Sequence, residues 1–150
     1  MPNTSERQLT LTNVGTGTDK KVTVTYNAHF TPFERHLAGL GLTFRELIYV
    51  MGMDPAGGTT GTILAVFPEV RLQVTDGNTP QTIPRTVSIN LSRATLNEDP
   101  GTLRPDDDEI RCKILILAAG MPPAVTPDAF TNQVVLQEVG GIFQGESRIA

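Results

Sequence analysis

The sequence has no tryptophan, one cysteine and two histidines among its 150 residues. Because a single cysteine cannot form an intramolecular disulfide, the fold does not require an oxidising compartment. With Tyr26 and Tyr49 as the only tyrosines, stacking of sugar rings on aromatic side chains is disfavoured. No cluster of His, Cys, Ser or carboxylate side chains has the spacing that catalysis needs, and the G-x-S-x-G pattern is absent. We therefore expect no catalytic residues, and a protein that binds or assembles.

The chain also lacks a basic stripe and a long apolar run. Its 12 Lys and Arg against 16 Asp and Glu give a net charge of −4, and Lys20–Lys21 is the only adjacent basic pair. Because nucleic-acid phosphates are bound by clustered Lys and Arg, we expect no nucleic-acid partner. No run of eighteen apolar residues occurs, and residues 1–13 show neither a basic nor an apolar region. We expect a soluble chain without membrane insertion or a classical signal peptide, in a cytoplasmic or particle-associated location.

Nearly all the apolar residues that are present fall into runs with the two-residue period of β-strands. Gly, Pro, Asn and Asp separate these runs, as they do in turns. Strands without long helices between them predict two packed antiparallel sheets, an all-β sandwich that is immunoglobulin-like or jelly-roll-like. The expected strands are residues 8–14, 20–30, 42–53, 61–67 and 69–75 with a break at Pro68, 82–93, 109–119 and 133–139.

One short helix is predicted near residues 32–38. Thr31 stands at the N-cap position, Pro32 at the first helical position and Glu34 three residues after the cap, which is a capping-box pattern. Two turns of helix are not stable alone. We therefore expect its apolar side chains to pack over an edge or an end of a sheet; these are Phe33, Leu37 and Leu40.

The chain is long enough for one domain that buries roughly 68–70% of its unfolded surface. No internal repeat or linker divides it, so residues 1–150 are expected to form a single β-sandwich. Its polar start predicts a flexible N-terminal arm, residues 1–7. After the last expected strand, residues 140–150 predict a C-terminal tail.

Two of the expected strands are apolar on both faces, residues 47–51 and 114–119. A sandwich with one wet face per sheet does not need this. Either the helix and loops cover the outer faces, or an outer face is buried against another subunit. The second alternative predicts a non-catalytic structural subunit that self-associates or docks on a larger particle or appendage. Its expected interface residues are Leu47, Tyr49, Met51, Leu115, Leu117, Ile142 and Phe143.

An acidic segment supports a second function, a calcium-assisted ligand-binding module. Six carboxylates lie within the twelve positions 98–109, and oxygen ligands of this kind suit calcium. The expected metal ligands are Asp106, Asp107, Asp108 and Glu109. The EF-hand pattern is absent, so a solvated acidic loop is the structural alternative.

A third function, that of a small hydrolase or isomerase, would use His29, Glu34 or His36. Residues two apart on a helix point about 200° away from each other, which sets Glu34 and His36 apart. Their structural interpretation is one capping carboxylate and two surface or edge histidines. Cys112 stands between Ile110 and Ile114 on the same face of an alternating strand. It is therefore expected in the core, where burial makes its thiol unreactive.

Overall fold

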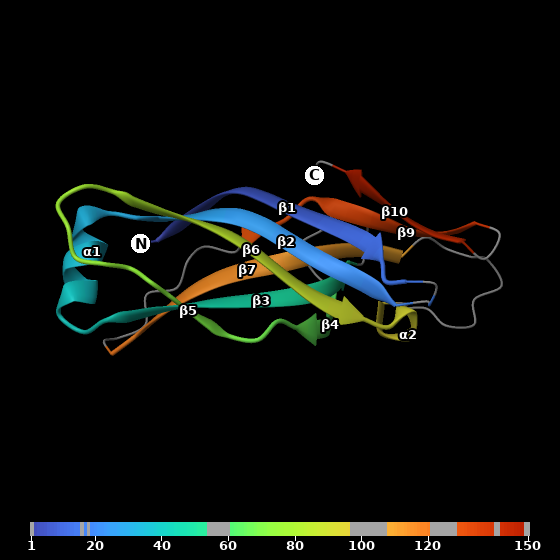
Figure 1. Ribbon diagram of the computed structural model, residues 1–150, viewed down its shortest axis with the longest axis horizontal. Helices are drawn as coiled ribbons and strands as arrows, with labels where there is room; N and C mark the ends of the chain where they lie inside the picture. The colour runs from blue at the N-terminus through green and yellow to red at the C-terminus, as the bar shows by residue number, and fades with distance from the viewer. Residues whose placement is uncertain are drawn as a thin grey trace.

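The computed structural model describes residues 2–15, 17, 19–53, 61–96, 108–120, 129–139 and 142–148. Within them lie two antiparallel sheets and two short helices (Figure 1). The small sheet has the order β1-β2-β6, from β1 (Asn3–Asn13), β2 (Lys20–Phe30) and β6 (Gln81–Leu91). The large sheet has the order β10-β9-β7-β3-β4, from β10 (Ile142–Arg148), β9 (Gln133–Val139), β7 (Asp108–Ala119), β3 (Thr43–Met53) and β4 (Gly61–Val66).

Four shorter elements complete the described fold. Strand β5 (Val70–Leu72) pairs with β3, and β8 (Ala129–Phe130) pairs with β7. Helix α1 (Pro32–Gly39) and the one-turn helix α2 (Arg93–Leu96) lie near opposite ends of the sandwich (Figure 1). Pro68 falls between β4 and β5, where the sequence predicted a break. The predicted all-β sandwich with one short helix near residues 32–38 is confirmed, and α2 adds a single turn.

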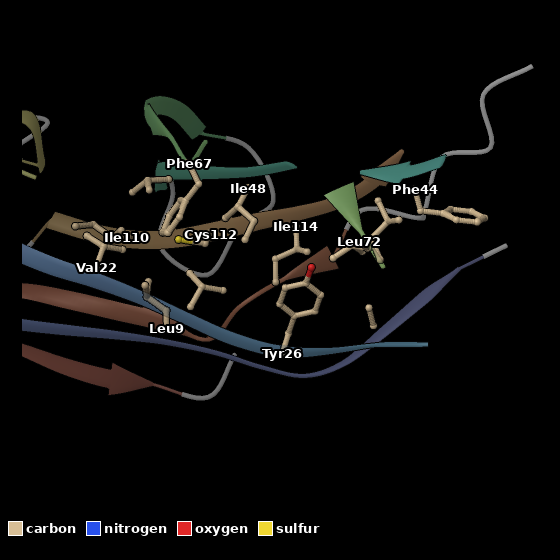
Figure 2. Packing of buried hydrophobic residues seen from close by; sticks show 14 of the residues in the cluster. Leu9, Val22, Tyr26, Phe44, Ile48, Phe67, Leu72, Ile110, Cys112 and Ile114 are labelled. Atoms are coloured by element: carbon tan, nitrogen blue, oxygen red, sulfur yellow. The ribbon is translucent and has the colours of Figure 1, made fainter. Parts of the chain in front are cut away.

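Alternating burial along the strands builds the core between the sheets. Every second residue of β2 is buried, from Val22 to Phe30, and the residues between them are partly exposed. The branched side chains of these strands fit a half-buried pleated surface. Figure 2 shows Leu9, Val22 and Tyr26 pointing across the interior toward the large sheet. The rings of Phe30 and Phe44 meet edge to face between the sheets, with centroids 5.0 Å apart.

The capping box of α1 is present as predicted. The backbone N–H of Thr31 donates to Oε1 of Glu34 at 2.8 Å, and the N–H of Glu34 donates to the Thr31 hydroxyl at 3.2 Å. Glu34 is buried by this contact. Phe33 is next to the buried Glu34, and successive helical residues point about 100° apart. The side chain of Phe33 faces solvent and is 69% exposed. Leu40 lies past the helix and is 85% exposed, so only Leu37 packs against the core as expected.

Arg35 ties together two crossings between the sheets at this end. Helix α1 links β2 to β3, and residues 73–80 link β5 to β6. The guanidinium of Arg35 donates to the carbonyl oxygens of Thr75 and Thr79, both at 2.7 Å. A Cβ at Gly77 would stand 2.3 Å from Nη2 of Arg35, so a side chain there would displace the end of the arginine from its hydrogen bonds.

Both chain ends differ from the sequence-based expectation. Residues 3–7, expected in a flexible arm, belong to β1, whose ladder is interrupted by a bulge between Ser5 and Gln8. Glu6 has φ 52° there. In the expected tail, residues 142–148 form β10 and pair with β9. Polar sequence on an edge strand hides the apolar alternation, which is why the sequence did not indicate these strands.

Residues of the β8–β9 segment cover the free edge of β1. The N–H of Leu9 donates to Oδ1 of Asn132 at 2.6 Å, and Nδ2 of Asn132 donates to the Leu9 carbonyl at 3.3 Å. The side-chain amide thus replaces a neighbouring peptide group. Arg7 adds a hydrogen bond to the carbonyl of Phe130 at 2.8 Å, and β10 lies beside β1. The small sheet is therefore joined to the large sheet along this side.

Replacing Thr31 by alanine should lower the free energy of unfolding by about 0.5–2 kcal/mol, because the N–H of Glu34 loses its acceptor. Thr31→Ser keeps a hydroxyl at the cap and should lose less. Urea denaturation of the two variants measures both effects. A Thr31→Ser chain as unstable as Thr31→Ala would show that the hydroxyl is not the stabilising group.

Candidate functional site

The outer face of the large sheet gathers apolar side chains from β3 and β7. Directly opposed residues of an antiparallel pair lie on the same face. Leu47 is opposite Leu115, and Tyr49 is opposite Lys113. Leu117, two residues further along β7, shares this face. These leucines and Tyr49 are half-buried. The structure therefore brings together, at the centre of the sheet, five of the seven interface residues expected from the sequence: Leu47, Tyr49, Met51, Leu115 and Leu117.

Strand β4 extends this face to the edge of the sheet. Val66 is opposite Tyr49 and Ile63 is opposite Met51, so both point outward. Ile63 is 54% exposed and Val66 is 48% exposed. We use the name apolar face for the set Leu47, Tyr49, Met51, Ile63, Val66, Leu115 and Leu117, of which Met51 is already buried within the chain.

The sequence did not predict that Ile63 and Val66 share a face. They are three residues apart, and strict alternation would put them on opposite sides of the strand. The register shifts between Val50 and Met51, which leaves Leu64 as an extra residue in β4. A bulge of this kind changes the direction of side chains along a strand. The alternation of a sequence does not reveal where such a bulge lies.

Charged side chains border the apolar face. Arg45 and Glu69 form an ion pair at 3.5 Å beside β5. Lys113 lies opposite Tyr49, and the guanidinium of Arg111 lies 5.3 Å from the centre of the Phe130 ring.

The outer face of the small sheet has a different chemistry. It is lined by hydroxyls and amides, which bond across the strands. The hydroxyls of Thr23 and Ser88 are 3.0 Å apart, and Asn27 donates to Glu6 at 2.8 Å. A face of this composition is well suited to water, so the two sides of the sandwich differ sharply in polarity.

The structure does not gather His29, Glu34 and His36 into one site. Glu34 serves the cap of α1, and Nδ1 of His36 lies 2.6 Å from Oδ1 of Asp76. His29 belongs to a row on the small sheet, with Nε2 2.5 Å from the Ser5 hydroxyl and Nδ1 3.0 Å from the Thr82 hydroxyl.

The sequence did not indicate the row of Ser5, His29 and Thr82, because Ser5 was expected in the N-terminal arm. A serine hydroxyl beside an imidazole is the start of a nucleophile and base pair. In this row, however, the Thr82 hydroxyl takes the place of the carboxylate that orients such a histidine. We interpret the row as cross-strand hydrogen bonding on the polar face.

Two of the four expected calcium ligands, Asp106 and Asp107, lie outside the described residues. Asp108 is described only by its position at the start of β7. The carboxylate of Glu109 accepts a hydrogen bond from Nε2 of Gln133 at 2.6 Å. Among the described residues no three His, Cys, Asp or Glu side chains are placed to share a metal ion. Calcium binding stays a prediction.

A buried polar cluster joins the two sheets behind the apolar face. The carboxylate of Glu46 on β3 is 1% exposed. It accepts a hydrogen bond from the Tyr26 hydroxyl at 2.5 Å and two from Arg85, at 2.8 and 3.2 Å. Burial raises the pKa of Tyr26 and the Glu46 carboxylate raises it further, so the phenol stays protonated. The hydrogen bond to Glu46 raises the pKa of Arg85, which stays charged.

Cys112 is fully buried on the inner face of β7, as the sequence predicted (Figure 2). Burial raises the pKa of its thiol well above the ordinary value. Its backbone N–H donates to the Thr131 hydroxyl at 2.9 Å, where the chain passes between β8 and β9. A thiol in this place is a small core group.

No family model, curated protein or solved structure matches this chain. In the part of the chain that is described, no helix has the length and apolar character to cross a membrane.

Arg85→Leu should lower the free energy of unfolding by roughly 3 kcal/mol, because it leaves the Glu46 carboxylate buried without its cation. The triple variant Tyr26→Phe, Glu46→Leu, Arg85→Leu removes all three polar groups and should regain most of that loss. Denaturant titration of both chains tests this. A triple variant less stable than Arg85→Leu alone would contradict the account of a desolvated charge.

A thiol reagent should modify Cys112 slowly in native buffer and rapidly in denaturant, since the thiol is buried and protonated. Absorbance of the released chromophore follows the reaction. Equal rates under the two conditions would contradict the position of Cys112 in the core.

Proposed function

We propose that this chain is a non-catalytic assembly subunit that associates with other copies through the apolar face of its large sheet. The observation that carries the proposal is the contrast between the two outer faces. A sandwich stabilises its core with the inward faces alone. Apolar side chains that are contiguous on the outside of one sheet mark a surface that binds a partner.

The size of the apolar face suits the centre of an interface. Neighbouring strands are about 4.8 Å apart and same-face residues about 6.8 Å apart along a strand. The seven side chains of the apolar face therefore cover roughly 230 Å², less than a third of the roughly 800 Å² that each partner of a stable complex contributes. The surrounding surface must supply the rest.

The surroundings have the polarity that such an interface needs. Arg45 of β3 and Lys113 of β7 border the apolar face. Glu69 forms an ion pair with Arg45. An apolar centre inside a charged rim is the usual anatomy of a protein interface. Leu47 and Leu115 lie directly opposite each other on the paired strands β3 and β7, at the centre of the apolar face. A substitution at either position therefore disturbs the middle of the contact.

The wild-type chain should be larger than a monomer by light scattering, and Leu47→Glu should shift it toward the monomer. A carboxylate at the centre of the apolar face would be buried without a partner, which opposes association. Thr25→Glu introduces the same charge on the polar face of the small sheet and should leave the mass unchanged. Circular dichroism confirms that both variants are folded.

Two outcomes contradict the proposal. A wild-type chain that stays monomeric at high concentration removes the function itself. An oligomer that Thr25→Glu dissociates and Leu47→Glu does not would move the interface to the other sheet.

A further inference from the structure

The large sheet ends at β10 on one side and at β4 on the other. Strand β4 pairs with β3 on one side, and no described strand pairs with its other side. Helix α2 lies beside β4 and contributes Leu96 to the core, yet Ile63 and Val66 remain about half exposed. The outer edge of such a strand carries backbone N–H and C=O groups that can pair with another strand.

The edges at β1, β5 and β6 carry features that discourage pairing. Proteins protect edges with proline, with charged side chains or with a covering segment. Strand β6 contains Pro84 and the inward charge of Arg85. The edge of β1 is covered by Asn132, and β5 is flanked by Pro68 and bears Arg71. Strand β4, with the sequence GTILAV, contains neither a proline nor a charged side chain, although Pro68 follows it and helix α2 contacts it.

We infer that β4 pairs in antiparallel fashion with β4 of a second copy, so that two large sheets form one continuous sheet across a two-fold axis. This rests on the proposed assembly function and specifies its partner. A two-fold axis sets the strand against itself, so any charge near the axis would meet its own copy. From residue 55 to residue 68 the sequence contains no charged side chain. A second copy is therefore electrostatically compatible in every antiparallel register of β4.

Pairing at this edge also completes the apolar face. Ile63 and Val66 lie on the outer side of β4, so the axis would bring them next to their copies. The apolar faces of the two chains then become one surface of twice the width. The combined surface is about twice the area of one apolar face, and it stays on the outer side of the continuous sheet.

Spin labels test the geometry. In a Cys112→Ala background, a nitroxide is attached in turn to a cysteine at Thr62, Ile63, Ala65 and Val66, and distances between the two labels of a dimer are measured by pulsed electron resonance. Strands advance about 3.4 Å per residue, so the separation should have a minimum at one site and grow by about 7 Å per residue away from it. The bulge at Leu64 perturbs one step. Labels at Thr86 on β6 serve as the control and should lie far apart.

A charge on the edge gives an independent readout. Ile63→Lys should weaken dimerisation at least tenfold in sedimentation equilibrium, since two lysines would meet near the axis. Ser88→Lys on β6 should leave the dissociation constant unchanged.

The outcomes separate the inference from the function it specifies. A distance minimum within β4 together with the Ile63→Lys effect supports the inference. A dimer whose β4 labels are all far apart, and which Leu47→Glu alone dissociates, overturns edge pairing and leaves the assembly function in place. A wild-type chain that is monomeric at every concentration overturns both.

Discussion

The buried contact of Glu46 with Tyr26 and Arg85 sets which face of β3 turns inward. Both faces of this strand are largely apolar: Phe44, Ile48 and Val50 on one, Leu47, Tyr49 and Met51 on the other. Moving a strand by one residue exchanges its faces, and apolar character alone distinguishes the two arrangements weakly. In the exchanged arrangement Glu46 would leave the core, and Arg85 would face no carboxylate. The ion pair thus favours one register, and that register presents the apolar face.

Polar contacts also hold the two sheets together at one end of the sandwich and along one edge. Arg35 holds the crossings at one end, and Asn132 joins the edge of β1 to the large sheet. These contacts use polar groups to close the molecule on itself. Strand β4 is left as the open edge, next to the exposed part of the apolar face. The features that point to assembly therefore lie on one side of one sheet.

Alternation in the sequence predicted most strands because apolar and polar residues separate cleanly in strands such as β2 and β6. It failed where that separation is absent, at residues 3–7 of β1 and in β10. The apolar residues on both faces of β3 and β7 pointed to Leu47 and Leu115. The bulge at Leu64 hid the two residues that β4 adds to the apolar face. The same alternation places Glu46 between Phe44 and Ile48 on the inner face. Its partner Arg85 comes from a strand 39 residues away, and such pairing depends on how the sheets stack.

Hydrogen exchange of backbone amides over a range of protein concentrations tests the central claim, association through the large sheet, most directly. The account predicts that protection of amides in β3, β4 and β7 rises with concentration, while protection of the β6 edge stays constant. If exchange in β3, β4 and β7 is the same at every concentration, or if protection grows at β6 instead, the account is contradicted.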